Sequence, residues 1–186
     1  MLIVIEGDNG TGKTTLGNLL KNYGYNVISE EPEVIAMSKE FKKYPAGSIE
    51  RFNAFVGFNE YCLEKCKNIK NAVLIRSWIS TVSAAYADGL MTMEDAKKTA
   101  EKFLVQYPIP DLIIRLQCEY SVRIQRIKER SLKDNDKSDD ITSSRNNKYQ
   151  EILEIMQSFF PNWINLDSSE KNPDVILKEV LSMINR

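Results

Sequence analysis

The chain has 186 residues, of which 42% are hydrophobic and 27% are charged, and these are the proportions of a globular domain with a full core. Its 25 basic and 26 acidic side chains leave a net charge of −1, which argues against a surface that binds nucleic acid or an anionic membrane. The sequence contains no histidine, so serine–histidine triads, histidine general bases and histidine-ligated zinc are excluded.

No membrane span and no signal peptide are expected, because no apolar run is long enough and Met1 leads directly into a predicted strand. The cysteines, Cys62, Cys66 and Cys118, lack metal-type spacing, and Cys62 and Cys66 are one turn apart on a predicted helix. We therefore expect reduced thiols and a cytoplasmic protein.

The first predicted elements are a strand at 2–5 and a helix from about residue 13 that Gly24 ends. The segment GDNGTGKT between them, residues 7–14, matches the phosphate-loop pattern G-x-x-x-x-G-K-[ST] without a gap. In such a loop, backbone N–H groups and the positive end of the helix surround phosphate oxygens, while the lysine reaches the outer phosphates and the hydroxyl binds Mg²⁺. We predict that the following residues bind ATP, with Lys13 also catalytic and Thr14 the metal ligand: Asp8, Asn9, Gly10, Thr11, Gly12, Lys13, Thr14 and Thr15.

The rest of the chain continues to alternate between the two kinds of element. In order, the patterns predict a strand at 25–29, helices at 34–43 and 48–67, a strand at 72–75, helices at 80–87 and 92–106, a strand at 111–117, helices at 121–132 and 146–160, a strand at 163–166 and a helix from 173. This order predicts the α/β class, with the three-layer P-loop NTPase fold: a five-stranded parallel sheet with helices on both faces. We expect one kinase domain over residues 1–186, with a mobile lid at about 131–145.

Two charged side chains follow predicted strands at the carboxyl-end edge, where parallel sheets of this kind bind ligands. Glu31 lies just past the second strand, where it could act as a base or orient a metal-bound water, or remain a solvated loop carboxylate. Arg76 follows the third strand directly, and its planar guanidinium suits an anionic substrate. The alternative for Arg76 is a structural ion pair with a carboxylate of the crevice.

Three arginines, Arg123, Arg126 and Arg130, share one face of the helix that leads into the expected lid. They either form a solvated face, or one or two of them hold the transferring phosphoryl group when the lid closes.

Two phenylalanines, Phe52 and Phe55, lie one turn apart with Asn53 and Asn59 nearby. An aromatic ring can stack on a base and an amide can hydrogen-bond to its edge, although core packing is the ordinary role of a phenylalanine pair.

Taken together, these segments resemble the thymidylate kinase family of nucleoside and nucleotide kinases over nearly the whole chain. The resemblance rests on IEGDNGTGKTTL, Glu31-Pro32, RFNAFVGFNEY, Leu74-Ile75-Arg76-Ser77 with Ser80, PDLIIRL at 110–116, the arginine-bearing segment 123–137, and WINLD at 163–167. It implies ATP- and Mg²⁺-dependent phosphoryl transfer to a deoxynucleoside monophosphate, first of all dTMP to dTDP, in a homodimer.

The resemblance also implies roles for residues of this chain. Arg76 would hold the acceptor phosphate, and lid arginines such as Arg126 and Arg130 would stabilise the transferred charge. Phe55, or Phe52 if the register is shifted, would stack on the base. The expected acceptor site comprises Asn9, Glu31, Phe52, Phe55, Arg76 and Ser80.

Three positions differ from the family pattern and leave two alternatives open. Asn9 and Ile75 stand where the family has aspartate, and Glu30 stands where it has arginine before the Glu-Pro pair. The last difference allows a deoxynucleoside kinase that would use Glu31 as the base on a 5′-hydroxyl, although Ile75 departs from that pattern too. The other alternative is a nucleotide-binding protein with weak or no kinase activity.

Overall fold

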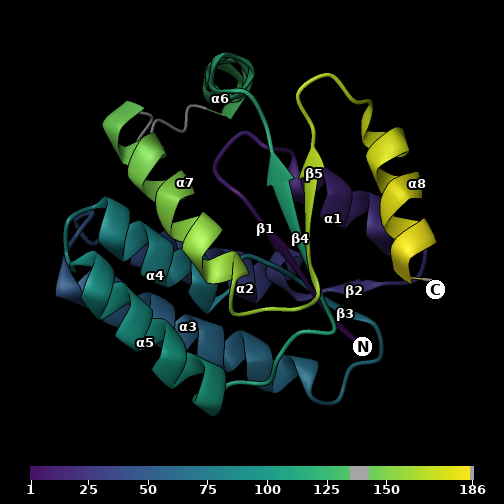
Figure 1. Cartoon of the computed structure of the whole chain (residues 1–186). Coiled ribbons are helices and arrows are strands. Elements are labelled where there is room, and N and C mark those ends of the chain that lie inside the picture. The colour runs from purple at the N-terminus through teal and green to yellow at the C-terminus, as the bar shows by residue number, and fades with distance from the viewer. Residues whose placement is uncertain (135–142, 185–186) are drawn as a thin grey trace.

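A parallel β-sheet lies at the centre of the computed structural model, which describes residues 1–134 and 143–184. Its five strands are ordered β2-β3-β1-β4-β5, and every neighbouring pair is parallel (Figure 1). The strands are β1 (Leu2–Glu6), β2 (Asn26–Val27), β3 (Ala72–Ile75), β4 (Leu112–Gln117) and β5 (Trp163–Asp167). The predicted α/β class with five parallel strands is confirmed.

Helices cover both faces of this sheet, as predicted (Figure 1). They are α1 (Lys13–Lys21), α2 (Pro32–Phe41), α3 (Ile49–Cys66), α4 (Trp78–Ala87), α5 (Met93–Gln106), α6 (Tyr120–Asp134), α7 (Ser143–Gln157) and α8 (Pro173–Ile184), with a short 3₁₀ helix η1 (Ile28–Glu30) after β2. One hydrophobic cluster joins α1 and α8 to one face, and another joins α3, α4, α5 and α7 to the other.

Strand β1 shows how the sequence divides between the two clusters. Ile3 and Ile5 belong to the α1/α8 cluster, whereas Val4 belongs to the cluster on the opposite face. Successive strand side chains point to opposite faces, and a sheet covered on both faces therefore needs apolar residues at consecutive positions. The same alternation directs Glu6, two residues after Val4, toward α4.

The second strand is shorter than predicted. The pattern at 25–29 predicts one strand, but β2 ends at Val27 and η1 follows. The Ser29 hydroxyl accepts a hydrogen bond from the Ile75 N–H at 2.8 Å and donates to the Ile75 carbonyl at 3.2 Å. This side chain thus satisfies backbone groups at the end of β3 that a longer β2 would pair with.

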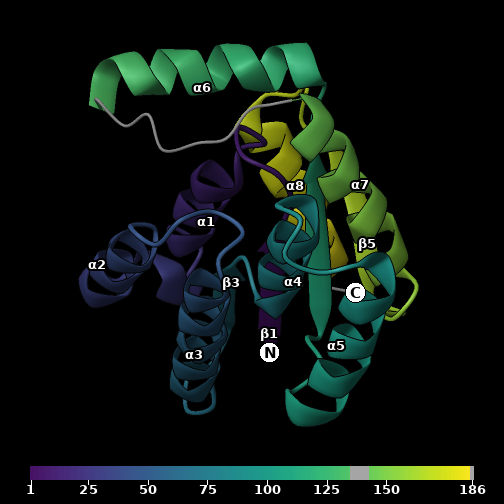
Figure 2. The same ribbon diagram turned by 90° about the vertical axis from the view of Figure 1, so that its left-hand side faces the viewer.

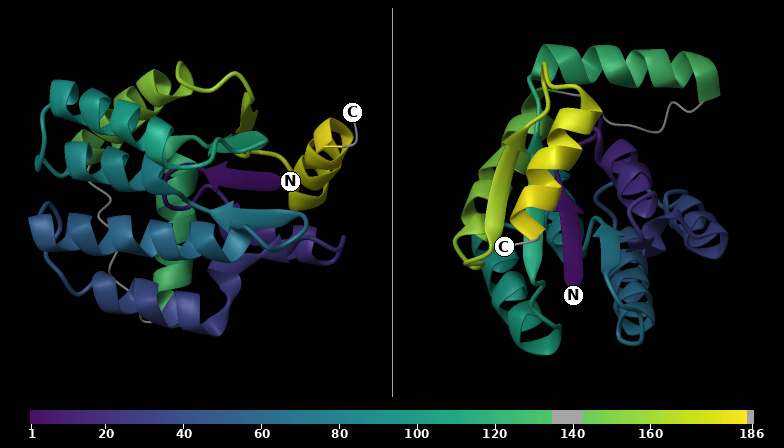
Figure 3. Two further views of the ribbon diagram at one scale, coloured as in Figure 1. Left: turned by 90° about the horizontal axis from the view of Figure 1, so that it is seen from below. Right: turned by 90° about the vertical axis from the view of Figure 1, so that its right-hand side faces the viewer.

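The expected lid at about 131–145 coincides in part with helices. Residues 131–134 continue α6 and residues 143–145 begin α7, while 135–142 lie outside the described residues. Helix α6 lies across the carboxyl-end edge of the sheet, above α1 and α8 (Figures 2 and 3). Within the described part of the chain, no helix is both long and apolar enough to cross a membrane.

Gly7 occupies a position at the end of β1 that a side chain cannot fill. Its φ is +134°, and a Cβ atom there would lie 2.4 Å from the Leu116 carbonyl oxygen. We expect Gly7→Ala to destabilise the fold by about 2–4 kcal/mol, since it combines backbone strain with a clash against a buried strand. Chemical denaturation measures this loss.

Gly57 provides the matched control, because it lies inside α3 and a Cβ there would meet nothing within 4 Å. Gly57→Ala should stabilise the protein by about 0.5–1 kcal/mol, as alanine does inside a helix. Equal effects of the two substitutions would contradict the close approach at Gly7.

Candidate active site

The phosphate loop connects β1 to α1 and is held firmly from outside. A Cβ at Gly10 would lie 2.9 Å from the Arg123 carbonyl oxygen, so α6 packs directly on the loop. Gly12 precedes α1 with φ +91°, and a Cβ there would meet nothing within 4 Å. Thr11 is buried, and its hydroxyl donates to the Asp8 carbonyl at 2.9 Å. The loop backbone is therefore fixed on one side and open where α1 begins.

Lys13 is buried at the centre of this loop, with 7% of its surface exposed. Its ammonium donates to the Asp8 carbonyl oxygen at 2.6 Å. Burial holds the pKa of Lys13 well below its usual range and the nearby Arg76 lowers it further, while the Asp8 and Glu6 carboxylates oppose both effects. A desolvated cation at the start of a helix is well suited to bind phosphate oxygens. Thr14 and Thr15 follow it and are exposed.

Arg123, from α6, supports the loop through a buried ion pair. Its guanidinium lies 2.6 Å from the Asp8 carboxylate, and both side chains are at least nine-tenths buried. Its Nε donates to the Asn9 carbonyl at 2.7 Å. A fully desolvated pair of this kind is costly to break, which suits a part that fixes the loop.

Arg126 lies on the outer side of the loop. It donates to the Ser168 carbonyl at 2.8 Å, to the Ser169 carbonyl at 3.2 Å and to the Gly10 carbonyl at 3.3 Å. The guanidinium thereby links α6 to the end of β5 and to the loop. Arg130, one turn further along α6, is exposed.

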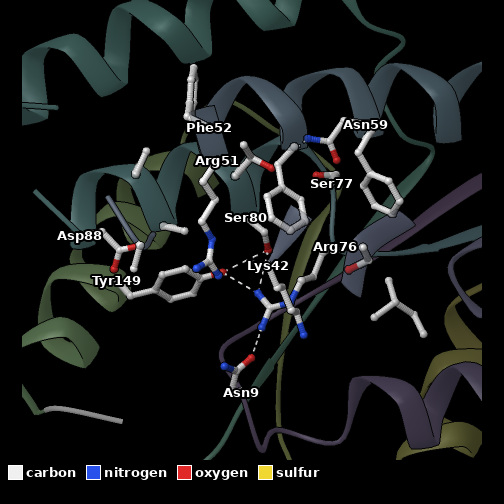
Figure 4. A pocket seen from close by; sticks show the side chains of 18 of the residues that line it. Asn9, Lys42, Arg51, Phe52, Asn59, Arg76, Ser77, Ser80, Asp88 and Tyr149 are labelled. Carbon is white, nitrogen blue, oxygen red and sulfur yellow. Dashed lines mark hydrogen bonds between the residues drawn. The ribbon is translucent and has the colours of Figure 1, made fainter. Parts of the chain in front are cut away.

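A cavity of about 380 Å³ opens beside the loop, between α2, α3, α4 and the start of α7 (Figure 4). Most of the predicted acceptor residues line it, namely Asn9, Phe52, Phe55, Arg76 and Ser80, and Thr14 also lines it. Glu31 is not among the lining residues, because its carboxylate is paired with Lys65 of α3. Glu30 lines the cavity instead, and partial burial raises the pKa of its carboxyl while Lys21 lowers it.

Arg76 directly follows the last residue of β3 and lies between the phosphate loop and the cavity. Its guanidinium donates to the Tyr149 hydroxyl at 2.9 Å, to the Ser80 hydroxyl at 3.1 Å and to the Asn9 side-chain oxygen (Figure 4). Its φ is +70°, a left-handed conformation that costs a non-glycine residue about 1–3 kcal/mol and is concentrated at functional sites. The backbone strain at Arg76 thus accompanies the placement of its guanidinium between the loop and the cavity.

The buried residue Glu6 was not singled out from the sequence. It is fully buried at the end of β1 and accepts hydrogen bonds from the Ser77 N–H at 2.9 Å, the Ser77 hydroxyl at 2.7 Å and the Ser80 hydroxyl. Burial raises the pKa of Glu6, and these hydrogen bonds oppose the rise. The alternation along β1 was the available signal, because it places an acid on a covered face.

The cavity wall carries more positive than negative side chains. Its described lining includes five basic residues, Lys39, Lys42, Arg51, Arg76 and Arg145, against three acidic ones, Asp8, Glu30 and Asp88. Two of the acids are already paired, Asp8 with Arg123 at 2.6 Å and Asp88 with Arg145 at 2.6 Å. A concave site with this excess of cations attracts an anionic ligand.

The end of the cavity beneath α3 has a different character. The Phe55 ring makes edge-on contacts with the Phe41 and Phe58 rings at centroid distances of 6.0 Å, and Phe52 also packs partly on the core. The Asn59 amide donates to the Thr81 hydroxyl at 2.8 Å. Aromatic walls with one amide and one hydroxyl can hold a flat heterocycle and hydrogen-bond to its edge.

The residues available to a magnesium ion are few. The Thr14 hydroxyl and the Glu30 carboxylate line the same cavity, whereas the Asp8 carboxylate is occupied by Arg123 and by the Asn9 N–H. In the part of the chain that the structure describes, no group of three acidic or cysteine side chains could hold a metal. This set suits an ion held mainly by phosphate oxygens and water, which is how Mg²⁺ binds to nucleotides.

Comparisons with known proteins agree with this geometry. A family model described as deoxynucleoside kinase matches residues 3–185. A protein described as "Probable thymidylate kinase 1" from Saccharolobus solfataricus is 27% identical over 195 residues, covering 100% of this chain and 97% of that protein. A "Probable thymidylate kinase" from Archaeoglobus fulgidus is 30% identical over 142 residues, covering 70% of each chain.

Solved structures share the fold. A deoxyadenosine kinase from M. mycoides with bound dATP superposes with a TM-score of 0.70 at 19% identity, over 100% of both chains. A thymidylate kinase from Candida albicans gives a TM-score of 0.74 at 17% identity, over 99% of this chain and 90% of that one. By its sequence, its sheet order and its phosphate loop, the chain belongs to the thymidylate kinase and deoxynucleoside kinase family of P-loop nucleotide kinases, whose members use ATP.

Proposed function

We propose that this kinase transfers the terminal phosphoryl group of ATP to a deoxynucleoside monophosphate, with dTMP as the first candidate acceptor and dTDP as the product. The observation that carries the proposal is the excess of basic side chains around the cavity, with the Arg76 guanidinium facing the phosphate loop. An acceptor that already carries a phosphate would neutralise this charge, and an uncharged nucleoside would not. Both archaeal relatives are described as "Probable thymidylate kinase".

In the proposed reaction, the protein contributes mainly position and charge. The loop backbone and Lys13 would bind the triphosphate, while Arg76 would bring the acceptor phosphate into line with it. Thr14 would hold Mg²⁺, which neutralises charge on the phosphates when bound. We also propose that Arg130, exposed on α6, approaches the transferred group when ATP is bound, and that Arg126 supports it from the loop side.

An acceptor panel tests this function. The purified protein is given ATP and Mg²⁺ with each deoxynucleoside and each deoxynucleoside monophosphate in turn, and products are identified by mass spectrometry. We expect dTMP to be converted to dTDP and thymidine to be left unchanged. Consumption of nucleosides but not of monophosphates would contradict the proposal.

A deoxynucleoside kinase is the second candidate, and one observation favours it. Glu30 places a carboxylate on the cavity wall at the position where the thymidylate kinase pattern has arginine, and it would repel an acceptor phosphate. In that case a carboxylate near the end of β2, Glu30 or Glu31, would act as the base on a 5′-hydroxyl. The panel separates the two candidates, because each consumes a different class of acceptor.

The Asn59–Thr81 pair is the proposed reader of the base. Asn59→Leu keeps the approximate volume but removes both hydrogen-bonding groups, leaving the half-buried hydroxyl of Thr81 without its donor. We expect the acceptor KM to rise by about 10- to 100-fold with little change in the KM for ATP. Steady-state kinetics with each substrate varied measures both, and an equal rise in the two constants would contradict this role.

Two further properties stay predictions. We propose a homodimer on the resemblance to the family, which sedimentation equilibrium of the purified protein would test. A cytoplasmic location is proposed because the cysteines form no disulfide. Two of them, Cys62 and Cys66, are buried in α3.

A further inference from the structure

We propose that Glu6 is a positioning residue, which sets the orientation of the Arg76 guanidinium through a hydrogen-bond chain of fixed direction and so controls acceptor binding without touching the acceptor. The inference rests on the proposed function in one respect, the role of Arg76 as the group that binds the acceptor anion.

The direction of the chain follows from the chemistry of its members. A guanidinium can only donate hydrogen bonds, and an ionised carboxylate can only accept them. Ser80 contacts the Glu6 carboxylate, so its single hydroxyl hydrogen is used there. The Tyr149 hydroxyl, 3.1 Å from that of Ser80, must then be the donor of their shared bond. Tyr149 in turn accepts from Arg76 at 2.9 Å, so each link points from the guanidinium toward Glu6.

Glu6 also fixes the backbone on which Arg76 stands. Arg76 adopts φ +70°, with its N–H bound to the Ile5 carbonyl at 2.9 Å. The next N–H, that of Ser77, is bound by the Glu6 carboxylate at 2.9 Å, and the same oxygen accepts from the Ser77 hydroxyl. One buried acid therefore holds the strained turn and the side chain that projects from it.

An acid in this place is not needed for packing. The neighbouring residues on this face of the sheet, such as Val4 and Leu74, are apolar, and burial of the Glu6 carboxylate removes its hydration. A buried acid with both oxygens directed at Ser77 and Ser80 is explained if it determines where their partners point. Its charge also attracts the Arg76 and Lys13 cations.

Glu6→Gln tests this chain because it changes the direction of the bonds and preserves the shape. The Ser77 N–H must still meet an oxygen, so the glutamine oxygen faces Ser77 and its NH₂ group faces Ser80. Ser80 must then turn its hydrogen toward Tyr149, whose own hydrogen loses its acceptor. The bonds from the Arg76 guanidinium to Ser80 and to Tyr149 are therefore weakened, although no volume is lost.

We expect Glu6→Gln to raise the KM for the acceptor consumed by the wild-type protein by about tenfold or more, with a much smaller change in the KM for ATP. Tyr149→Phe removes the middle of the chain and should raise the same constant. Because Glu6 and Tyr149 are linked through Ser80, the double variant should be little worse than the worse single variant. Multiplying effects, or an unchanged acceptor KM in Glu6→Gln, would overturn the proposal.

Ser83→Ala is the matched control. Ser83 lies one turn after Ser80 on α4, is fully buried, and its hydroxyl has no partner among the described residues. Its loss should leave both KM values unchanged. If Ser83→Ala raised the acceptor KM as much as Glu6→Gln does, the effect would belong to α4 packing and the proposal would be wrong.

A crystal structure of Glu6→Gln gives a readout that does not depend on turnover. We expect the Arg76 guanidinium to leave the positions 2.9 Å from the Tyr149 hydroxyl and 3.1 Å from the Ser80 hydroxyl that it occupies in the wild type. An unmoved guanidinium would overturn the inference. If the wild-type protein phosphorylated no acceptor in the panel, the proposed function would fail while this structural comparison would still decide the role of Glu6.

Discussion

Replacement of Lys13 by alanine is expected to lower kcat/KM by about 10³-fold or more, with the fold intact. The Lys13 ammonium is the cation at the start of α1, directed at the loop that would bind the triphosphate. Removing a preorganised charge that stabilises a transferring phosphoryl group costs about 10²- to 10⁵-fold in related chemistry. Steady-state kinetics with the acceptor varied at saturating ATP measures the loss in kcat/KM for the acceptor relative to the wild type.

The Lys13→Ala variant should lose activity without losing stability. The lysine is buried, and its lowered pKa reports that burial disfavours its charged form. We therefore expect the melting temperature to be unchanged or raised, as is common when a functional residue with a desolvated charge is removed. Lys21→Ala, an exposed lysine at the end of the same helix, is the control and should leave the rate unchanged. A variant Lys13→Ala with wild-type activity would contradict the kinase assignment of the loop.

The second large effect is expected at Arg76, where lysine should not replace arginine. Arg76→Lys keeps one positive charge but loses the planar fork that contacts Asn9, Ser80 and Tyr149 together. We expect the acceptor KM to rise by about 10²-fold, which corresponds to roughly 2.7 kcal/mol of lost binding. The measurement is the KM for dTMP at fixed ATP.

Calorimetric titration with ATP separates a lost acceptor contact from a damaged phosphate loop. Arg76→Lys should bind ATP about as tightly as the wild type. Lysine at position 76 adopts the same left-handed backbone as arginine does, and the substitution removes none of the contacts that Lys13 and Arg123 make with the loop. A loss of ATP affinity as large as the loss for dTMP would mean that Arg76 serves the loop and not the acceptor.

The fold could be predicted from the sequence because its signals are local. Short apolar strands such as Ile3–Ile5 must be covered on both faces, and the glycines of the phosphate loop have a backbone requirement that other residues cannot meet. These features depend on neighbours along the chain and were sufficient for the sheet and its helices. The predicted end of the second strand was wrong, because the observed end of β2 depends on a contact between Ser29 and Ile75, which are distant in sequence.

The site could be predicted only where a motif marks it. Lys13 and Thr14 begin the helix that follows the β1 loop, and Arg76 follows β3 directly. The parallel pairing of β1 with β3 brings these segments together. Tyr149 and Arg145 come from α7, which no motif connects to β3, although the structure brings Tyr149 to within 2.9 Å of Arg76. The pairing of Glu31 with Lys65 could not be read from the sequence either, since a carboxylate after a strand can turn toward the crevice or toward a helix.

The central claim is that a phosphorylated acceptor binds in the cavity with its phosphate on Arg76, facing a triphosphate held by the loop and Lys13. A crystal structure with a bisubstrate ligand, adenosine and thymidine joined through a polyphosphate chain, tests it most directly. We predict that the polyphosphate runs from the backbone of residues 10–14 to the Arg76 guanidinium, with the thymine between the phenylalanines of α3 and Asn59. A ligand bound with its thymidine outside this cavity, or with no phosphate on Arg76, would contradict it.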